Sequence, residues 1–126
     1  MNKDSFDYKQ AIDFLTAKDK AEQDKYHQLY LEAKHDFSAI TAMIISDYTP
    51  EKIYQWGSLL TPGNFDLNSD IDIAVEGIGS TEQFFKLYDK ALAMTDFSLD
   101  LVEMEKISEV HRKSIIQHGK MIYEKR

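Results

Sequence analysis

The sequence predicts an α/β (α+β) protein, in which a small mixed β-sheet is flanked by helices and preceded by a long N-terminal helical arm. Residues 5–48 contain no glycine or proline and are mostly helix formers, which indicates the arm. Beyond residue 50, short strand-like runs alternate with helix-like segments, an order typical of a sheet covered by helices. We therefore expect an arm over residues 1–49 and a domain over residues 50–126.

Composition restricts the classes of partner. The chain has 126 residues, with 15 Lys and Arg against 22 Asp and Glu, so its formal charge of −7 argues against binding long DNA or RNA. It has no cysteine, which excludes disulfides and thiolate zinc sites. Its longest apolar stretch, residues 39–45, is too short to cross a bilayer. We expect a soluble, cytoplasmic protein that does not bind membranes.

The arm has an apolar patch near each end. Toward the domain, apolar residues follow helical spacing at Tyr26, Leu29, Tyr30, Ala33, Phe37, Ile40, Met43 and Ile44. That half should pack on the domain. Nearer the N-terminus lie Phe6, Ile12, Phe14 and Leu15, separated from the first set by the charged residues 18–25. We favour a solvated stretch of one helix or a join between two helices; the alternative is an arm that docks on a partner, so that the chain forms a homo- or hetero-oligomer.

The first strand and its loop follow the arm. Thr49-Pro50 should end the helical region, because proline disfavours a helical conformation in the residue before it. Residues 53–56 read as a short strand leading into Gly57-Ser58. A turn signal at residues 61–64 makes residues 59–68 a loop, which returns the chain to a second strand over residues 69–75.

The rest of the domain alternates helix and strand. Ser80 begins a capping-box pattern, so a helix should run from there to about Met94. We expect its inward residues to be Phe84, Leu87, Tyr88, Ala91 and Leu92. Residues 97–102 predict a strand, Ser108 should cap a helix that ends at His118 and Gly119, and residues 121–123 predict an edge strand.

Acidic residues on the predicted strands indicate a metal site. Asp70 and Asp72 are two residues apart, so one strand face carries both, and together they can hold a divalent cation. Asp100, on a later strand, would supply a third carboxylate if the two strands are neighbours. Gly57 and Ser58 suit a phosphate, because glycine lets the backbone approach closely and serine adds a hydroxyl donor. Ser69, just before the acids, is a further candidate for nucleotide binding.

This set of residues fits transfer of a nucleotidyl group from a nucleoside triphosphate. Such transfer depends on positioning and on charge stabilisation, commonly with two metal ions. Asp70, Asp72 and Asp100 would be the catalytic metal ligands for Mg²⁺, possibly two ions, and Asp100 would also suit the role of taking a proton from the acceptor hydroxyl.

The same residues resemble the DNA polymerase beta-like nucleotidyltransferase superfamily, and within it the minimal nucleotidyltransferases of the antitoxin type. That pattern is an apolar residue, Gly, Gly or Ser, a loop, then Asp-apolar-Asp-apolar, and residues 56–58 and 70–73 match it. Residues 99–102 look like the strand with the third acid, and residues 112–123 look like the close of such a domain. The resemblance covers about residues 53–123.

The resemblance implies a function and a partner. It implies magnesium-dependent transfer of AMP from ATP, or of another NMP, to a hydroxyl. It also implies a small helical HEPN-type protein, a toxin ribonuclease, as the partner that is neutralised by adenylylation (AMPylation) of a tyrosine. The alternative, of a different class, is an inactive module with the same fold that neutralises the partner by complex formation alone.

One departure from the family pattern keeps that alternative open. Family members commonly carry an arginine or lysine in the loop after Gly-Ser, whereas residues 59–69 contain none and include Asp66. Charge compensation for a triphosphate would then come from the metals or from a distant basic residue. The candidates, which the sequence does not rank, are Lys86, Lys90, Lys106, Arg112 and Lys113.

Other features receive structural interpretations. His27, His35, His111 and His118 read as surface residues rather than metal ligands, and Phe84, Phe85 and Tyr88 as core. Ser58 has no histidine base in register, which argues against a serine hydrolase. A processive polymerase is set aside because the remaining residues cannot form a thumb-like domain. An antibiotic-modifying enzyme is chemically possible but would usually need a second domain.

Overall fold

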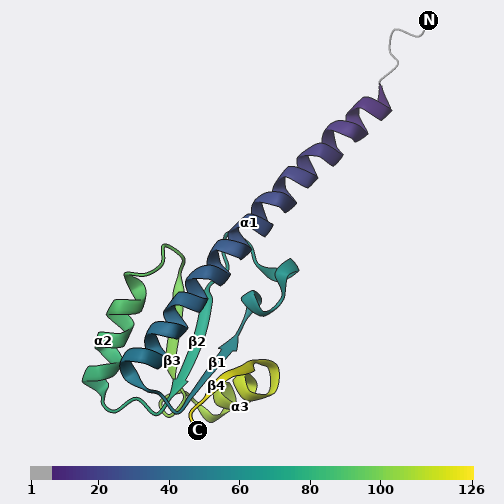
Figure 1. The fold of residues 1–126 in the computed structure, drawn as a ribbon. Helices are drawn as coiled ribbons and strands as arrows, with labels where there is room; N and C mark the ends of the chain where they lie inside the picture. The colour runs from purple at the N-terminus through teal and green to yellow at the C-terminus, as the bar shows by residue number, and fades with distance from the viewer. Residues whose placement is uncertain (1–6) are drawn as a thin grey trace, which may run out of the picture.

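A computed structural model describes residues 7–126 and places nine elements along them (Figure 1). In chain order they are α1 (Tyr8–Tyr48), β1 (Lys52–Trp56), the 3₁₀ turns η1 (Ser58–Leu60) and η2 (Pro62–Asn64), β2 (Ile71–Glu76), α2 (Thr81–Leu92), β3 (Leu99–Glu103), α3 (Glu109–His118) and β4 (Lys120–Glu124). Phe6, counted above in the outer apolar patch, lies outside the described residues.

The strands form one four-stranded mixed sheet in the order β3-β2-β1-β4. β1 is antiparallel to both β2 and β4, whereas β2 and β3 are parallel and joined by the crossover helix α2. The predicted fold class, a small mixed sheet flanked by helices, is confirmed. β4 is an edge strand, as the sequence predicts.

The two faces of the sheet pack against different helices. On one face, Ile53, Ile73 and Leu101 join buried residues of α1 and α2 in the larger hydrophobic core. On the other face, Tyr54 and Ala74 pack with Ile115 of α3 and its neighbours in a smaller core. Because side chains alternate along a strand, Trp56 and Asp72 share this second face with Tyr54 and Ala74.

Helix α1 is continuous for 41 residues, so the charged residues 18–25 are a solvated stretch of one helix. Its buried residues begin only at Tyr30, and Figure 1 shows the preceding part extending away from the rest of the molecule. Asp7 caps its start by accepting a hydrogen bond from the Gln10 N–H, and Thr49 ends it in a left-handed conformation before Pro50. The second half of α1 therefore contributes to the core, as expected; the division of the chain at residues 49 and 50 stays a prediction.

The capping predictions are confirmed, but two inward assignments on α2 are wrong. The hydroxyls of Ser80 and Ser108 accept hydrogen bonds from the Gln83 and His111 N–H groups at the starts of α2 and α3. On α2, however, Phe85 is 62% exposed and Leu92 is 44% exposed. The buried face of α2 is already occupied by Phe84, Leu87 and Ala91. Phe85 and Leu92 each directly follow one of these residues, so they lie about 100° farther around the helix.

Among residues 7–126, no helix is both long enough and apolar enough to span a membrane.

Candidate nucleotide and metal site

Two predicted site residues, Asp72 and Asp100, lie in one row across the sheet with Trp56, the residue before Gly57. Trp56 of β1 pairs with Asp72 of β2, and Asp72 pairs with Asp100 of the parallel strand β3. Neighbouring strands are about 4.8 Å apart, so directly paired side chains on one face are in close proximity. The adjacency of β2 and β3, which the sequence could only assume, brings Asp72 and Asp100 together.

Asp70 lies at the edge of this row. β2 begins at Ile71, one residue after Asp70, so Asp70 is outside the strand in which the sequence analysis placed it. It is solvent-exposed, but its charge still acts on Asp72. The three acids thus differ in environment: Asp72 is buried within the sheet, and Asp70 and Asp100 are exposed.

Among residues 7–126, Asp72 has no partner that would balance a negative charge. Its exposed fraction is 9%, and no donor among residues 7–126 is hydrogen-bonded to its carboxylate. Burial, followed by the negative charges of Asp100 and Asp70, raises the pKa of Asp72 from its ordinary value of 3.8 to about 7. A group that is costly to ionise in isolation favours a bound cation, which would relieve both burial and repulsion.

Gly57 lies against the Asp72 carboxylate. Its φ is +85°, and a Cβ built on it would be 1.9 Å from Oδ2 of Asp72. Only glycine fits this conformation and this approach. The backbone therefore passes beside the acid as it turns from β1 into η1, and this turn places the start of the Gly-Ser segment at the row of carboxylates.

The two candidate serines have different surroundings. Ser58 is half-buried and begins η1 directly after Gly57. The Ser69 hydroxyl accepts a hydrogen bond from the Asp66 N–H at 3.0 Å and donates to the Asp66 carboxylate at 3.3 Å. Asp66 also accepts from the Asn68 N–H, so it holds together the turn that leads into Asp70. Asp66, which looked unfavourable for a triphosphate, has a structural role, and the role of Ser69 in nucleotide binding stays a prediction.

The carboxylates are suitable ligands for Mg²⁺, but they are not arranged as a finished cage. Mg²⁺ prefers oxygen ligands, which carboxylates supply. Because no hydrogen bond stabilises the Asp72 carboxylate, a bound cation would stabilise its charged form most. In the part of the chain that the structure describes, no three His, Asp or Glu side chains are grouped closely enough to hold a metal ion. Movement of the two exposed acids, Asp70 and Asp100, toward Asp72 would be required to complete the set.

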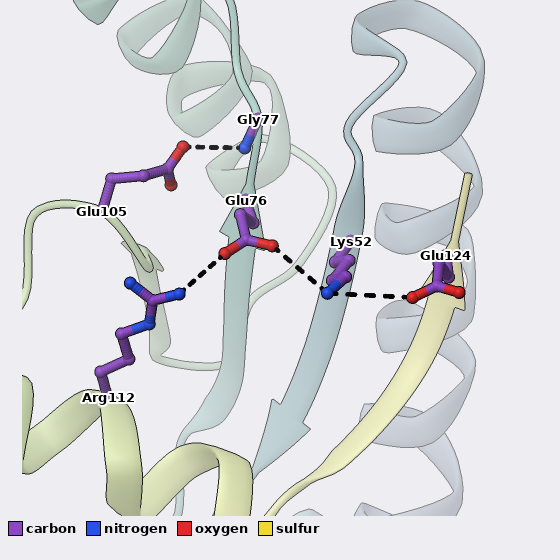
Figure 2. A network of polar contacts seen from close by, with 6 residues as sticks. All are labelled: Lys52, Glu76, Gly77, Glu105, Arg112 and Glu124. Carbon is purple, nitrogen blue, oxygen red and sulfur yellow. Dashed lines mark hydrogen bonds and ion pairs between the residues drawn. The ribbon is translucent and has the colours of Figure 1, made fainter. Parts of the chain in front are cut away.

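Each of the five basic candidates has an acidic partner. Lys86, Lys90, Lys106, Arg112 and Lys113 form ion pairs with Glu82, Asp47, Glu103, Glu76 and Glu109, respectively. Figure 2 shows Arg112 in a chain of contacts through Glu76 and Lys52 to Glu124. Glu76 is four residues beyond Asp72 on β2, about 13 Å along the strand, so this network lies toward the other end of the sheet.

His111 is a residue whose position the sequence reading missed. Its ring meets the ring of Trp56 edge-on, with centroids 5.8 Å apart, and it is half-buried instead of on the surface. The available signal was its spacing, since His111 is four residues from the buried Ile115 and so shares the inner face of α3. His27, His35 and His118 are exposed, as expected.

Comparisons with known proteins show the family of the chain. A family model described as "Polymerase beta, Nucleotidyltransferase" matches residues 38–126. The chain belongs to the polymerase beta nucleotidyltransferase family, and the resemblance found in its motifs is confirmed. The comparison with curated proteins found no match.

Two solved structures are similar. One is a crystal structure of a toxin-antitoxin with AMP-PNP, 27% identical, with a TM-score of 0.56; the match covers 70% of this chain and 73% of that one. The other is a mutant of the toxin-antitoxin MntA-HpeT, 24% identical, also with a TM-score of 0.56, covering 71% of this chain and 72% of that one. The second likeness concerns the fold alone.

Proposed function

We propose that this protein transfers AMP from ATP to a hydroxyl group, a tyrosine of a helical HEPN-type toxin, and thereby acts as an antitoxin in the cytoplasm. Family membership supports the class of reaction, nucleotidyl transfer. The choice of ATP is supported by the similar toxin-antitoxin structure, which was solved with AMP-PNP. The tyrosine and the HEPN-type partner rest on the resemblance noted in the sequence.

The observation that carries the proposal is the pair of carboxylates beside Gly57. Asp72 and Asp100 are directly paired on parallel strands, and Gly57 contacts Asp72 at the turn into Ser58. This arrangement puts candidate metal ligands and a backbone segment able to approach phosphate next to each other. Both are needed in one place for nucleotidyl transfer.

Asp70, Asp72 and Asp100 would hold Mg²⁺. When bound, the ion would polarise the triphosphate and offset its charge. This contribution matters here because residues 59–69 supply no basic side chain and the five predicted cations are all paired with acids.

The chain's own residues would do the rest. Gly57 and Ser58 would orient the triphosphate through backbone N–H groups and a hydroxyl. The acceptor oxygen would attack the α-phosphorus and form the new P–O bond, while the bond from that phosphorus to the bridging oxygen breaks and pyrophosphate leaves. Asp100, the partner of Asp72 on β3, would accept the hydroxyl proton.

A second candidate function is neutralisation of a partner by binding alone. Two observations favour it: the described residues contain no preformed three-ligand group, and no basic side chain lies in the loop after Gly-Ser. In this case the nucleotidyltransferase fold would bind the partner without transferring a nucleotide to it.

The test is transfer of label from α-labelled ATP, GTP, CTP and UTP with Mg²⁺ to the protein encoded by the neighbouring gene. We expect label from ATP on a tyrosine of that protein, and none with Asp72→Asn. Asp89→Asn, which removes an exposed carboxylate on α2, is the matched control and should keep full transfer. A tight, inhibitory complex without label would favour the binding function, and equal transfer by Asp72→Asn would exclude the proposed role of Asp72.

A further inference from the structure

The face of α1 that packs on the domain continues beyond the domain. With about 100° per residue, Ile12, Leu15 and Tyr26 lie within roughly 50° of the midline between Tyr30 and Phe37, which are buried in the core. Ile12 and Leu15 are 61% and 57% exposed. The apolar stripe that packs on the domain from Tyr30 onward is thus open to solvent in the preceding part of α1. This part, residues 8–29, is about 33 Å long.

The charges on this face have one sign. Between Leu15 and Tyr26, the charged residues within roughly 70° of the same line are Asp19 and Glu22. Lys18 and Lys20 lie about 100° to either side, and Lys25 lies farther around the helix. We call the surface formed by Ile12, Leu15, Asp19, Glu22 and Tyr26 the arm face.

A groove lies at the root of the arm face. It has a volume of about 550 Å³ and is lined by Gln23, Tyr26 and His27 of α1 and by residues 62–66 of the loop. This loop connects Gly57-Ser58 to Asp70. Anything lying along the arm face and entering the groove would therefore contact the segment that joins the two halves of the candidate site.

We propose that the arm face and its groove bind a segment of a protein partner that carries both apolar and basic side chains. The apolar residues match Ile12, Leu15 and Tyr26, and the basic residues match Asp19, Glu22 and, in the groove, Asp66. A second copy of this chain fits poorly, because it would set the acids of one arm face against those of the other.

The arm also has a physical reason to be covered. Most of the stability of helices in proteins comes from tertiary packing, and the buried residues of α1 begin only at Tyr30, so packing of the apolar side of the arm against a partner would stabilise it. This inference rests on the proposed function only in taking the bound partner to be the acceptor. The docking itself requires no chemistry at Asp72.

The chain offers a matched control for the arm face. Phe14 is 68% exposed, as apolar and as accessible as Leu15, but it lies about 100° farther around the helix. The experiment replaces either Leu15 or Phe14 with a photo-crosslinking benzophenone amino acid in the full chain, in the cells that naturally produce it. The crosslinked products are then identified by mass spectrometry.

We expect a product with a different protein from position 15, at least about tenfold more than from position 14, through a segment rich in Lys or Arg and apolar residues. Asp19→Lys with Glu22→Lys should reduce that product by about tenfold or more, whereas Asp72→Asn should leave it unchanged. If the protein forms this crosslinked product but transfers no nucleotide, the proposed enzymatic function is wrong and the docking proposal still holds.

The proposal is overturned by a product that is a dimer of this chain, by equal yields from the two positions, by no product, or by insensitivity to the charge reversal. Circular dichroism should show that the variants keep the helical content of the parent chain.

Discussion

Gly57 and Asp72 are in direct contact, and this contact joins the two halves of the candidate site. A Cβ on residue 57 would lie 1.9 Å from Oδ2 of Asp72 and 2.9 Å from its Cγ. Gly57 directly follows β1 and Asp72 lies in β2, near the point where Trp56 pairs with Asp72. The glycine is therefore needed both for its backbone conformation and for its lack of a side chain.

Gly57→Ala should destabilise the protein by about 1–3 kcal/mol, because it combines a positive φ with displacement of a buried carboxylate. Urea unfolding followed by circular dichroism measures the loss. Gly63→Ala is the control, since no atom lies within 4 Å of a Cβ at residue 63, and it should change stability by less than about 0.5 kcal/mol. Equal effects of the two substitutions would contradict the close approach at Gly57.

Asp72→Asn should make the protein more stable at neutral and alkaline pH. The pKa of Asp72 is raised from 3.8 to about 7 in the folded state, so the folded chain holds this proton more tightly than the unfolded chain does. The resulting stabilisation is complete below the unfolded pKa of 3.8 and is lost as pH rises through about 7. The ionised aspartate then lowers stability, which asparagine avoids.

The measurement is the free energy of unfolding of both proteins at several values from about pH 4 to pH 8. The rise in the pKa of Asp72 from 3.8 to about 7 corresponds to about 4 kcal/mol before screening by solvent, so we expect the variant to gain about 2–4 kcal/mol at the upper end and less than about 1 kcal/mol at the lower end. Asp89→Asn on α2 should follow the parent chain throughout. A variant whose stability falls with pH as steeply as that of the parent would show that another group is responsible.

Mg²⁺ should stabilise the parent chain at about pH 8 but not the Asp72→Asn variant. A cation bound by Asp72 and Asp100 would offset the charge that destabilises the folded state. At a concentration one hundred times the dissociation constant, the gain is about 2.7 kcal/mol. Thermal unfolding with Mg²⁺ and with the chelator EDTA tests this, and an equal response from both proteins would place the bound ion elsewhere.

Arg112→Ala should lower stability by about 1 kcal/mol without changing nucleotidyl transfer. Its guanidinium donates to Glu76 at 3.2 Å, in the network that Figure 2 shows toward the far end of β2 from Asp72. Lys113→Ala removes an exposed pair with Glu109 and should be neutral. If transfer fell strongly with Arg112→Ala while stability did not, Arg112 would belong to the triphosphate site.

Much of the fold could be predicted because its signals are local. Pro50, Ser80, Ser108 and Gly119 end or cap helices through contacts a few residues apart, and the periodicity of residues 26–44 identifies the packed half of α1. The order of motifs also predicted the neighbouring carboxylates. Strand order and register, however, were assumptions until the structure paired Asp72 with Asp100.

The remaining features depend on contacts between distant segments. Phe85 is exposed because the inner face of α2 is already filled, and His111 is half-buried because Trp56 lies beneath it. Whether a lysine or arginine is available to a ligand depends on which acid lies nearby in space. Sequence separation does not reveal that Arg112 meets Glu76.

We propose that the nucleotide binds where Gly57 meets Asp72. The most direct measurement is titration of the isotope-labelled protein with a non-hydrolysable ATP analogue and Mg²⁺, followed by backbone amide NMR. We expect the largest shifts at Gly57, Ser58, Asp72 and Asp100, and we expect Asp72→Asn to abolish them. Largest shifts at Arg112 and its neighbours, or in the groove at residues 62–66, with Gly57 unchanged, would contradict it.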